Sequence, residues 1–325
     1  MKKKGLLLVG LLLVLCLFTL MGCGGEEEPA ADNSDSDVKA EDVVENDAYT
    51  DLERKVLSAL EPLPDKMEGA KIGVVFPTFS NPFYVSGEEG YKDAAASMGI
   101  EVEVVAGATE DDVEGQLNVF KTMIGKDYDA IIIVPITGMN LISGVVEANE
   151  KGIPIICSGT TLDEDAAAEA GAEIAAHMTY NFEEQGYVGA KYISEKIKAE
   201  GGENAKVAVI EGLAGAFQGE ARRDGAVKAF KEAGMNIVAV QAGDWDRQKA
   251  FDIATNLIQS NPDLKGIFAT FNRGAIGAAQ AVKSKEKQED IKIVAYDADA
   301  DEIKLLEEGI IDALVVQQPY EMGRL

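Results

Sequence analysis

The chain has 325 residues, of which 46% are hydrophobic, and this is enough apolar material for two domains. Its formal net charge at pH 7 is −27. A surface so acidic repels nucleic acids and anionic membranes, so nucleic-acid binding is excluded.

The amino terminus has the pattern of a secretion signal. Lysines at positions 2 to 4 precede an apolar run from Leu6 to Met21, which is too short and too weakly flanked for a membrane-spanning helix. The run ends in Leu20-Met21-Gly22-Cys23, which resembles the bacterial lipobox, where the cysteine is lipidated and becomes the first mature residue. We therefore expect a signal peptide over residues 1–22. Lipidation of Cys23 would then anchor the protein to the extracytoplasmic side of the cell membrane.

An acidic stretch follows the predicted anchor. Between Glu26 and Asp47 lie ten acidic residues and one lysine, a composition that predicts a disordered, self-repelling spacer. Apolar residues recur at helical spacing over Asp51–Leu60, which predicts a short helix. Residues 23–69 are therefore predicted to form an acidic tether with one short helix.

From Lys71 onward, nearly continuous apolar runs alternate with amphipathic stretches. Such runs are typical of parallel strands buried on both faces, and their alternation with helices predicts doubly wound α/β domains. The predicted strands are Lys71–Phe76, Glu101–Val105, Ala130–Val134, Pro154–Cys157, Lys206–Ile210, Asn236–Val240, Gly266–Thr270, Ile291–Tyr296 and Asp312–Val316. The predicted helices include Phe83–Met98, Val113–Lys126, Asn181–Lys198, Gln218–Ala233, Arg247–Ser260 and Asp301–Glu308.

The alternation runs through two successive blocks, so we predict two α/β domains joined by a hinge. The N-terminal domain spans residues 70–175 and is completed by a return segment, 318–325. The C-terminal domain spans residues 176–317. Ligands of such open sheets bind beyond the carboxyl ends of the strands, so the candidate site residues are those that follow strands.

After the first predicted strand, Asn81 and Pro82 form a good helix start, with Asn81 as the cap. A helix start alone is one interpretation of this segment. The other is a ligand site, because Phe83 and Tyr84 offer aromatic faces beside an amide. Aromatic faces cover the C–H side of a sugar ring, and amides and carboxylates hydrogen-bond its hydroxyls.

The second block offers four further candidates. Trp245 is the only tryptophan, and it either stacks on a ligand or packs in the core. Asp297 ends a predicted strand and either binds a ligand or caps a helix. Gln317 follows the last predicted strand, and Glu220 either contacts a ligand or pairs on a helix surface.

The sequence offers no catalytic set. It has no Ser/His/Asp arrangement and no cluster of metal ligands at usable spacing, and the glycine-rich segment Glu211–Gly225 lacks the pattern of a phosphate loop. Cys157 is predicted to be a buried thiol, and His177 is predicted to pack at a strand end. We therefore expect no enzymatic activity, no cofactor and no metal.

Together, these segments resemble the type I periplasmic binding proteins of sugar ABC transporters, above all the ribose- and allose-binding type. The resemblance covers about Lys71 to Leu325. It implies that Asn81 and Phe83 hold a sugar while Tyr84 and Trp245 stack on it, that Asp297 accepts hydroxyl hydrogens, and that Gln317 contributes near the hinge. It rests on Ser80-Asn81-Pro82-Phe83, Ile210-Glu211-Gly212, Gly219-Glu220-Ala221-Arg222-Arg223, Asp244-Trp245-Asp246-Arg247 and Gln317.

The chain departs from that family's pattern at several positions. Pro77 stands where a polar residue is common, and Ser158-Gly159-Thr160 stands where an Asp-Arg or Asp-Glu pair is frequent. Phe271 and Asn272, which we also count with the site, stand where Asn-Asp is usual. Charged contacts to hydroxyls are therefore fewer, and a deoxy sugar or a non-sugar polyol becomes an alternative ligand.

The resemblance implies a monomeric, non-enzymatic bacterial receptor. It would capture a small pentose- or hexose-like carbohydrate and deliver it to an ABC permease, touching the membrane only through its lipid anchor. A receptor for a chemotaxis or signalling sensor is one alternative, and a nucleotide-dependent α/β enzyme is another. Because that family continues beyond the position of Leu325, we expect a truncated C-terminus.

Overall fold

The computed structural model describes residues 55, 56, 58, 59, 62 and 67–325. The predicted signal peptide, Cys23 and most of the predicted tether lie outside these residues. The four described residues within the predicted helix Asp51–Leu60 are helical, namely Lys55, Val56, Ser58 and Ala59. A helix with the length and apolar character needed to cross a membrane does not occur in the described part of the chain.

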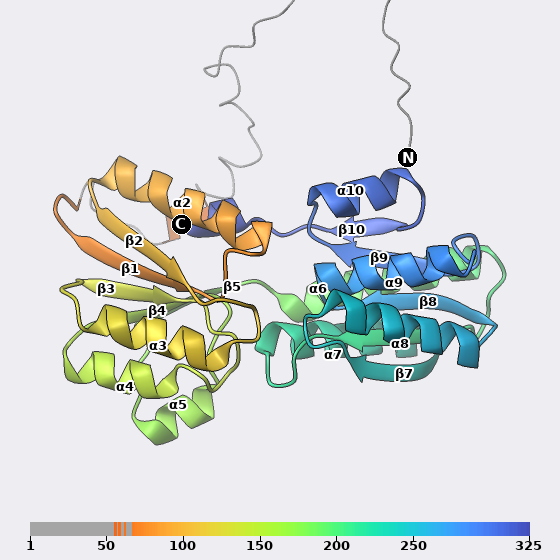
Figure 1. Cartoon of the computed structure of the whole chain (residues 1–325), viewed down its shortest axis with the longest axis horizontal. Helices are drawn as coiled ribbons and strands as arrows, with labels where there is room; N and C mark the ends of the chain where they lie inside the picture. The colour runs from red at the N-terminus through yellow and green to blue at the C-terminus, as the bar shows by residue number, and fades with distance from the viewer. Residues whose placement is uncertain (1–54, 57, 60–61, 63–66) are drawn as a thin grey trace, which may run out of the picture. The chain divides into compact units, whose positions relative to one another are not determined.

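The first half of the described chain builds a five-stranded parallel sheet (Figure 1). Its central strands are almost wholly apolar, because helices cover both of their faces. In spatial order the strands are β2 (Glu101–Ala106), β1 (Lys71–Phe76), β3 (Ala130–Ile133), β4 (Ile155–Gly159) and β5 (Ala176–Thr179).

Helices cover the two faces of this first sheet. One core cluster joins it to α3 (Val113–Ile124), α4 (Ile142–Glu150) and α5 (Glu164–Ala170). A second cluster joins β1 to α2 (Pro82–Met98) on the other face. We call this sheet with its helices the first lobe.

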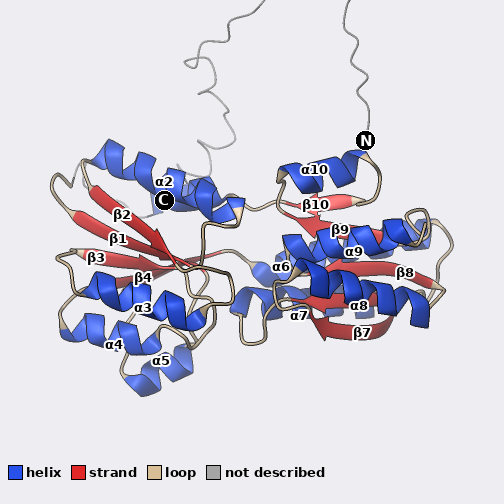
Figure 2. Ribbon diagram, in the orientation of Figure 1, coloured by secondary structure: helices blue, strands red, loops and turns tan. Residues whose placement is uncertain are grey.

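The second lobe is built in the same way around another five-stranded parallel sheet (Figure 2). Helices α6 (Phe182–Ala199) and α7 (Phe217–Glu232) pack on one face, and α8 (Arg247–Ser260) and α9 (Asn272–Ser284) on the other. Helix α10 (Ala300–Glu307) precedes the last strand. The strand order is β10 (Ala313–Val315), β9 (Lys292–Tyr296), β8 (Leu264–Ala269), β6 (Lys206–Glu211) and β7 (Asn236–Ala242).

The chain passes from the first lobe to the second between β5 and α6, and it returns between β10 and α11 (Pro319–Arg324). Helix α11 packs against α2, where the Tyr320 hydroxyl donates to Asp93 at 2.6 Å. The two helices approach so closely that a Cβ on Gly90 would lie 2.1 Å from the Tyr320 carbonyl oxygen. The segment after Gln317 therefore lies on the first lobe.

The predicted fold class is confirmed: the chain contains two doubly wound parallel sheets. All nine predicted strands are present, and each end lies within two residues of its predicted position. Strand β5 was not predicted, because it is a short edge strand with mostly exposed side chains and no continuous apolar run. It extends the first sheet to Thr179, four residues past the predicted boundary at residue 175.

Candidate ligand-binding site

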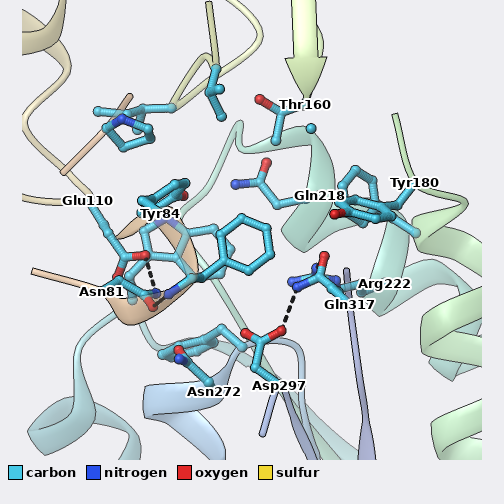
Figure 3. A pocket seen from close by; sticks show the side chains of 18 residues that line it. Asn81, Tyr84, Glu110, Thr160, Tyr180, Gln218, Arg222, Asn272, Asp297 and Gln317 are labelled. Atoms are coloured by element: carbon cyan, nitrogen blue, oxygen red, sulfur yellow. Dashed lines mark hydrogen bonds between the residues drawn. The ribbon is translucent and has the colours of Figure 1, made fainter. Parts of the chain in front are cut away.

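A cavity lies where the loops that follow the strands of both sheets meet (Figure 3). Its empty space is about 640 Å³, open solvent at its mouth included. The expectation that the site lies at the carboxyl ends of the strands fits this position. The lining residues are Pro77, Asn81, Phe83, Tyr84, Glu110, Val134, Ile136, Gly159, Thr160, Tyr180, Phe182, Gln218, Arg222, Trp245, Phe271, Asn272, Asp297 and Gln317.

The structure brings all but one of the predicted ligand-binding residues to this cavity. The residues that line it are Asn81, Phe83, Tyr84, Trp245, Phe271, Asn272, Asp297 and Gln317. Glu220 is the exception, because its Oε1 accepts a hydrogen bond from the Gly215 N–H at 3.0 Å, outside the cavity.

The helical period explains why Glu220 lies outside. Gln218 and Arg222 are four residues apart on α7, so they share one face of the helix, and both line the cavity. Glu220 lies midway between them in sequence and therefore projects from the opposite face. The sequence showed the spacing, but it did not show which face of α7 meets the cavity.

Asn81 caps a helix and also lines the cavity. Its Oδ1 accepts the Phe83 N–H at 3.0 Å and so caps α2, while its side chain also lines the cavity. Its Nδ2 donates to Glu110 Oε1 at 2.9 Å. The cap thus holds a carboxylate at the cavity edge.

Glu110 is a site residue that the sequence analysis missed. It lies in the loop after β2, and its partial burial in the cavity wall raises the pKa of its carboxyl group. Its position after a predicted strand was the available signal. Its Oε2 lies 3.9 Å from Nη1 of Arg273, which belongs to the second lobe.

Three polar side chains from the second lobe also meet at the cavity, where hydrogen bonds link them in a row. Gln317 Nε2 donates to Asp297 Oδ1 at 2.9 Å, and Arg222 Nη2 donates to Gln317 Oε1 at 2.8 Å. Burial raises the pKa of Asp297. A carboxylate has about four lone-pair positions, so Asp297 keeps acceptor capacity for a ligand.

Arg222 is held rigidly at the back of this chain. Its guanidinium group lies 4.9 Å from the ring centre of Phe182 and 4.4 Å from that of Tyr296. Its Nη1 donates to the Thr270 carbonyl at 3.0 Å, and its Nε donates to Gln185 at 3.0 Å. With these contacts, Arg222 orients Gln317 and offsets part of the charge of Asp297.

Asp297 does not cap a helix, because α10 begins at Ala300 and its cap residue is Asp299. Its backbone has a φ of 63°, a left-handed conformation that is uncommon for residues other than glycine, asparagine and aspartate.

Trp245 lines the cavity and belongs to the core of the second lobe as well. Its side chain is 8% exposed, and its ring lies edge-on to Phe271 with 5.1 Å between the ring centres. A Cβ on Gly212 would lie 2.1 Å from the indole, so that glycine makes room for the ring. The two interpretations of Trp245, stacking and core packing, are therefore not exclusive.

Two contacts join the lobes beside the cavity. The Gly138 N–H donates to the Gly215 carbonyl at 3.1 Å, and Arg273 faces Glu110. The loops of the two lobes therefore meet around the cavity.

The remaining two predictions about reactive residues have different outcomes. Cys157 is a fully buried thiol, as predicted, and burial raises its pKa to about 11. The prediction that His177 packs at a strand end is wrong. It lies within the exposed edge strand β5, and its Nδ1 is 2.9 Å from the Thr161 hydroxyl.

Glu302, close behind Asp297, is buried and has no hydrogen-bond partner for either carboxylate oxygen among the described residues. Burial and the nearby Asp299, Asp297 and Asp301 raise its pKa to about 7. A raised folded-state pKa stabilises the protein at low pH, and this stability is lost as pH rises from the ordinary glutamate range through about 7.

We therefore expect Glu302→Gln to reduce the loss of thermal stability between pH 5 and pH 8. The melting temperature of the unliganded wild-type protein should fall further over this range than that of the variant, by about 2–4 °C. Glu307→Gln, on the exposed side of α10, is the control and should behave as wild type. Equal pH dependence of wild type and Glu302→Gln would show that Glu302 does not titrate in this window.

Comparison with known proteins shows extensive similarity. The model of a family described as periplasmic binding protein domain matches residues 72–325. The D-allose-binding periplasmic protein of Escherichia coli (strain K12) is 39% identical over 255 residues, which are 78% of this chain and 81% of that protein. The ribose import binding protein RbsB of Bacillus subtilis (strain 168) is 30% identical over 254 residues, 78% of each chain.

A solved structure is similar over the same region. It is an ABC transporter periplasmic solute binding protein from Actinobacillus succinogenes 130z with bound D-allose. The TM-score is 0.71 and the sequence identity 31%, and the match covers 78% of this chain and 87% of that one.

Proposed function

The chain belongs to the periplasmic binding protein domain family, and from this premise we propose that it is the solute-binding subunit of a sugar ABC importer. It captures a small carbohydrate in the cavity between its lobes and delivers it to a membrane permease. The family consists of extracytoplasmic binding proteins and not of enzymes. We further propose that the receptor acts as a monomer.

The observation that carries this proposal is the composition of the cavity wall. Phe83, Tyr84 and Trp245 supply aromatic surface, while Asp297 and Gln317 supply an acceptor and an amide. This combination suits a sugar, whose ring has apolar C–H faces and a rim of hydroxyls. Side chains from both lobes line the cavity, so a ligand bound there stabilises the arrangement in which the lobes meet.

A thermal-shift screen tests the proposal. The panel contains D-allose, D-ribose, further pentoses and hexoses, deoxysugars and polyols, and each compound is also tested on Asp297→Asn as the binding-deficient control. A sugar present at 100 times its dissociation constant should stabilise the wild-type protein by about 2.7 kcal/mol. Stabilisation by polyols alone would mean that the ligand is a polyol and not a sugar. If no compound of the panel stabilises the protein, carbohydrate binding is refuted.

The second part of the proposal is the lipid anchor at Cys23, which is supported by the lipobox-like sequence Leu20-Met21-Gly22-Cys23. We expect Cys23→Ser to release the protein from the membrane fraction, because the lipid chains hold it there. Fractionation and immunoblotting of expressing bacteria measure this, with Cys157→Ser as the control that keeps the lipobox. If Cys23→Ser stays on the membrane after a high-salt wash, the lipoprotein proposal is wrong.

A further inference from the structure

The end of β4 and the residue after it, Gly159 and Thr160, form one part of the cavity wall. This part of the wall carries no charged side chain. The Thr160 hydroxyl lines the cavity but donates to the Pro135 carbonyl at 2.8 Å. The neighbouring Ser158 hydroxyl accepts from Tyr91 at 2.7 Å inside the first lobe. Thr160 therefore has no hydrogen left to donate to a ligand, although its oxygen can still accept one.

Gln218 extends into this part of the cavity from the first turn of α7, below Thr160 in Figure 3. Its Oε1 is buried and has no hydrogen-bond partner among the residues that the structure describes. An unpaired buried acceptor is unfavourable, so a ligand that donates a hydrogen to it gains affinity.

Tyr180 lies in the connection between β5 and α6, and it also lines the cavity. Its hydroxyl is buried, and although the Gln318 backbone is close, no described residue makes a hydrogen bond of ordinary geometry with it. Burial raises the pKa of this hydroxyl. It therefore stays protonated and can donate.

The two groups are complementary. Of the described residues with a buried, unpartnered polar side-chain atom, Gln218 and Tyr180 are the ones that line the cavity. One offers an acceptor and the other a donor. A hydroxyl group can donate to the first and accept from the second, whereas a carboxylate or phosphate group can only accept.

We propose that Gln218 and Tyr180 form a neutral subsite that recognises one hydroxyl of the ligand, so the receptor selects neutral sugars that carry a hydroxyl at that position. This inference rests on the proposed sugar-binding function. Glu110 and Asp297 support it, because these two acidic side chains outnumber the one basic side chain of the cavity lining, Arg222, and so disfavour a negatively charged ligand.

Calorimetry with Tyr180→Phe and Gln218→Met tests the subsite, since each variant removes the polar group and keeps most of the side-chain volume. The probes are whichever of D-allose and D-ribose binds the wild-type protein more tightly, and the monodeoxy analogues of that sugar. Glu220→Gln, on the other face of α7, is the matched control.

Each variant should bind the parent sugar about tenfold more weakly than wild type. Wild type should reject one monodeoxy analogue by about tenfold or more, while Tyr180→Phe and Gln218→Met bind that analogue and the parent sugar almost equally. The control should keep the wild-type profile, and the melting temperature of each variant verifies its fold.

Wild-type affinity and unchanged discrimination in both variants would overturn the subsite and leave the proposed function standing. Failure of the wild-type protein to bind any sugar of the thermal-shift panel, D-allose and D-ribose included, would instead contradict the proposed function. If one variant does not fold, the other decides the result, because each removes one half of the same hydroxyl site.

Discussion

Asp297→Asn should weaken the binding of the tightest-binding sugar by at least about 100-fold, because hydrogen bonds to a buried carboxylate contribute about 1.5–3 kcal/mol each. Asparagine tolerates the left-handed backbone of this position, and its side-chain oxygen can still accept from Gln317. The substitution therefore removes the charge without changing the shape of the site. Isothermal calorimetry measures the effect.

Asp263→Asn is the matched control, since Asp263 is an exposed aspartate of the same lobe that pairs with Lys206 at 2.9 Å. It should bind as wild type. Circular dichroism and the melting temperature establish that both variants are folded. Unchanged affinity in Asp297→Asn would mean that Asp297 only positions Gln317.

Trp245→Ala should lower both stability and affinity, because the indole belongs to the core and to the cavity wall. Loss of a buried aromatic side chain should reduce the free energy of unfolding by about 3–5 kcal/mol. Loss of an aromatic anchor should weaken sugar binding by about 10- to 100-fold. Denaturant titration without ligand measures the first effect, and calorimetry at low temperature measures the second.

Trp245→Phe is the comparison for this experiment, since it keeps an aromatic face against Phe271 and should show smaller losses of both kinds. Trp245 is the only tryptophan, so in the wild-type protein a change in tryptophan fluorescence on adding sugar has one source. A large loss of stability with normal affinity would mean that Trp245 packs in the core and does not contribute to ligand binding. Normal stability with weak binding would mean that Trp245 contacts the ligand and does not contribute to the core.

The sequence by itself determined nine of the ten strands that the structure describes, six of its helices and eight of the residues that line the cavity. Strands buried on both faces must be nearly continuous apolar runs, and so nine strands could be predicted. Because parallel strands end on the same edge of a sheet, the residues after Phe76 and Tyr296 could be assigned to a site. The start of α2 was readable too, since Asn81 and Pro82 form a local signal that needs no tertiary contact.

Only the tertiary structure decided which side chains meet. Glu110 and Tyr180 enter the cavity from loops whose direction depends on the packing of neighbouring strands, and β5, before Tyr180, carries no apolar run. The orientation of α7 is set by contact with α6, where a Cβ on Gly186 would lie 1.9 Å from the Arg222 carbonyl oxygen. That contact fixes the rotation of α7 about its axis. It therefore places Gln218 and Arg222 in the cavity and keeps Glu220 outside, a choice that helical spacing alone leaves open.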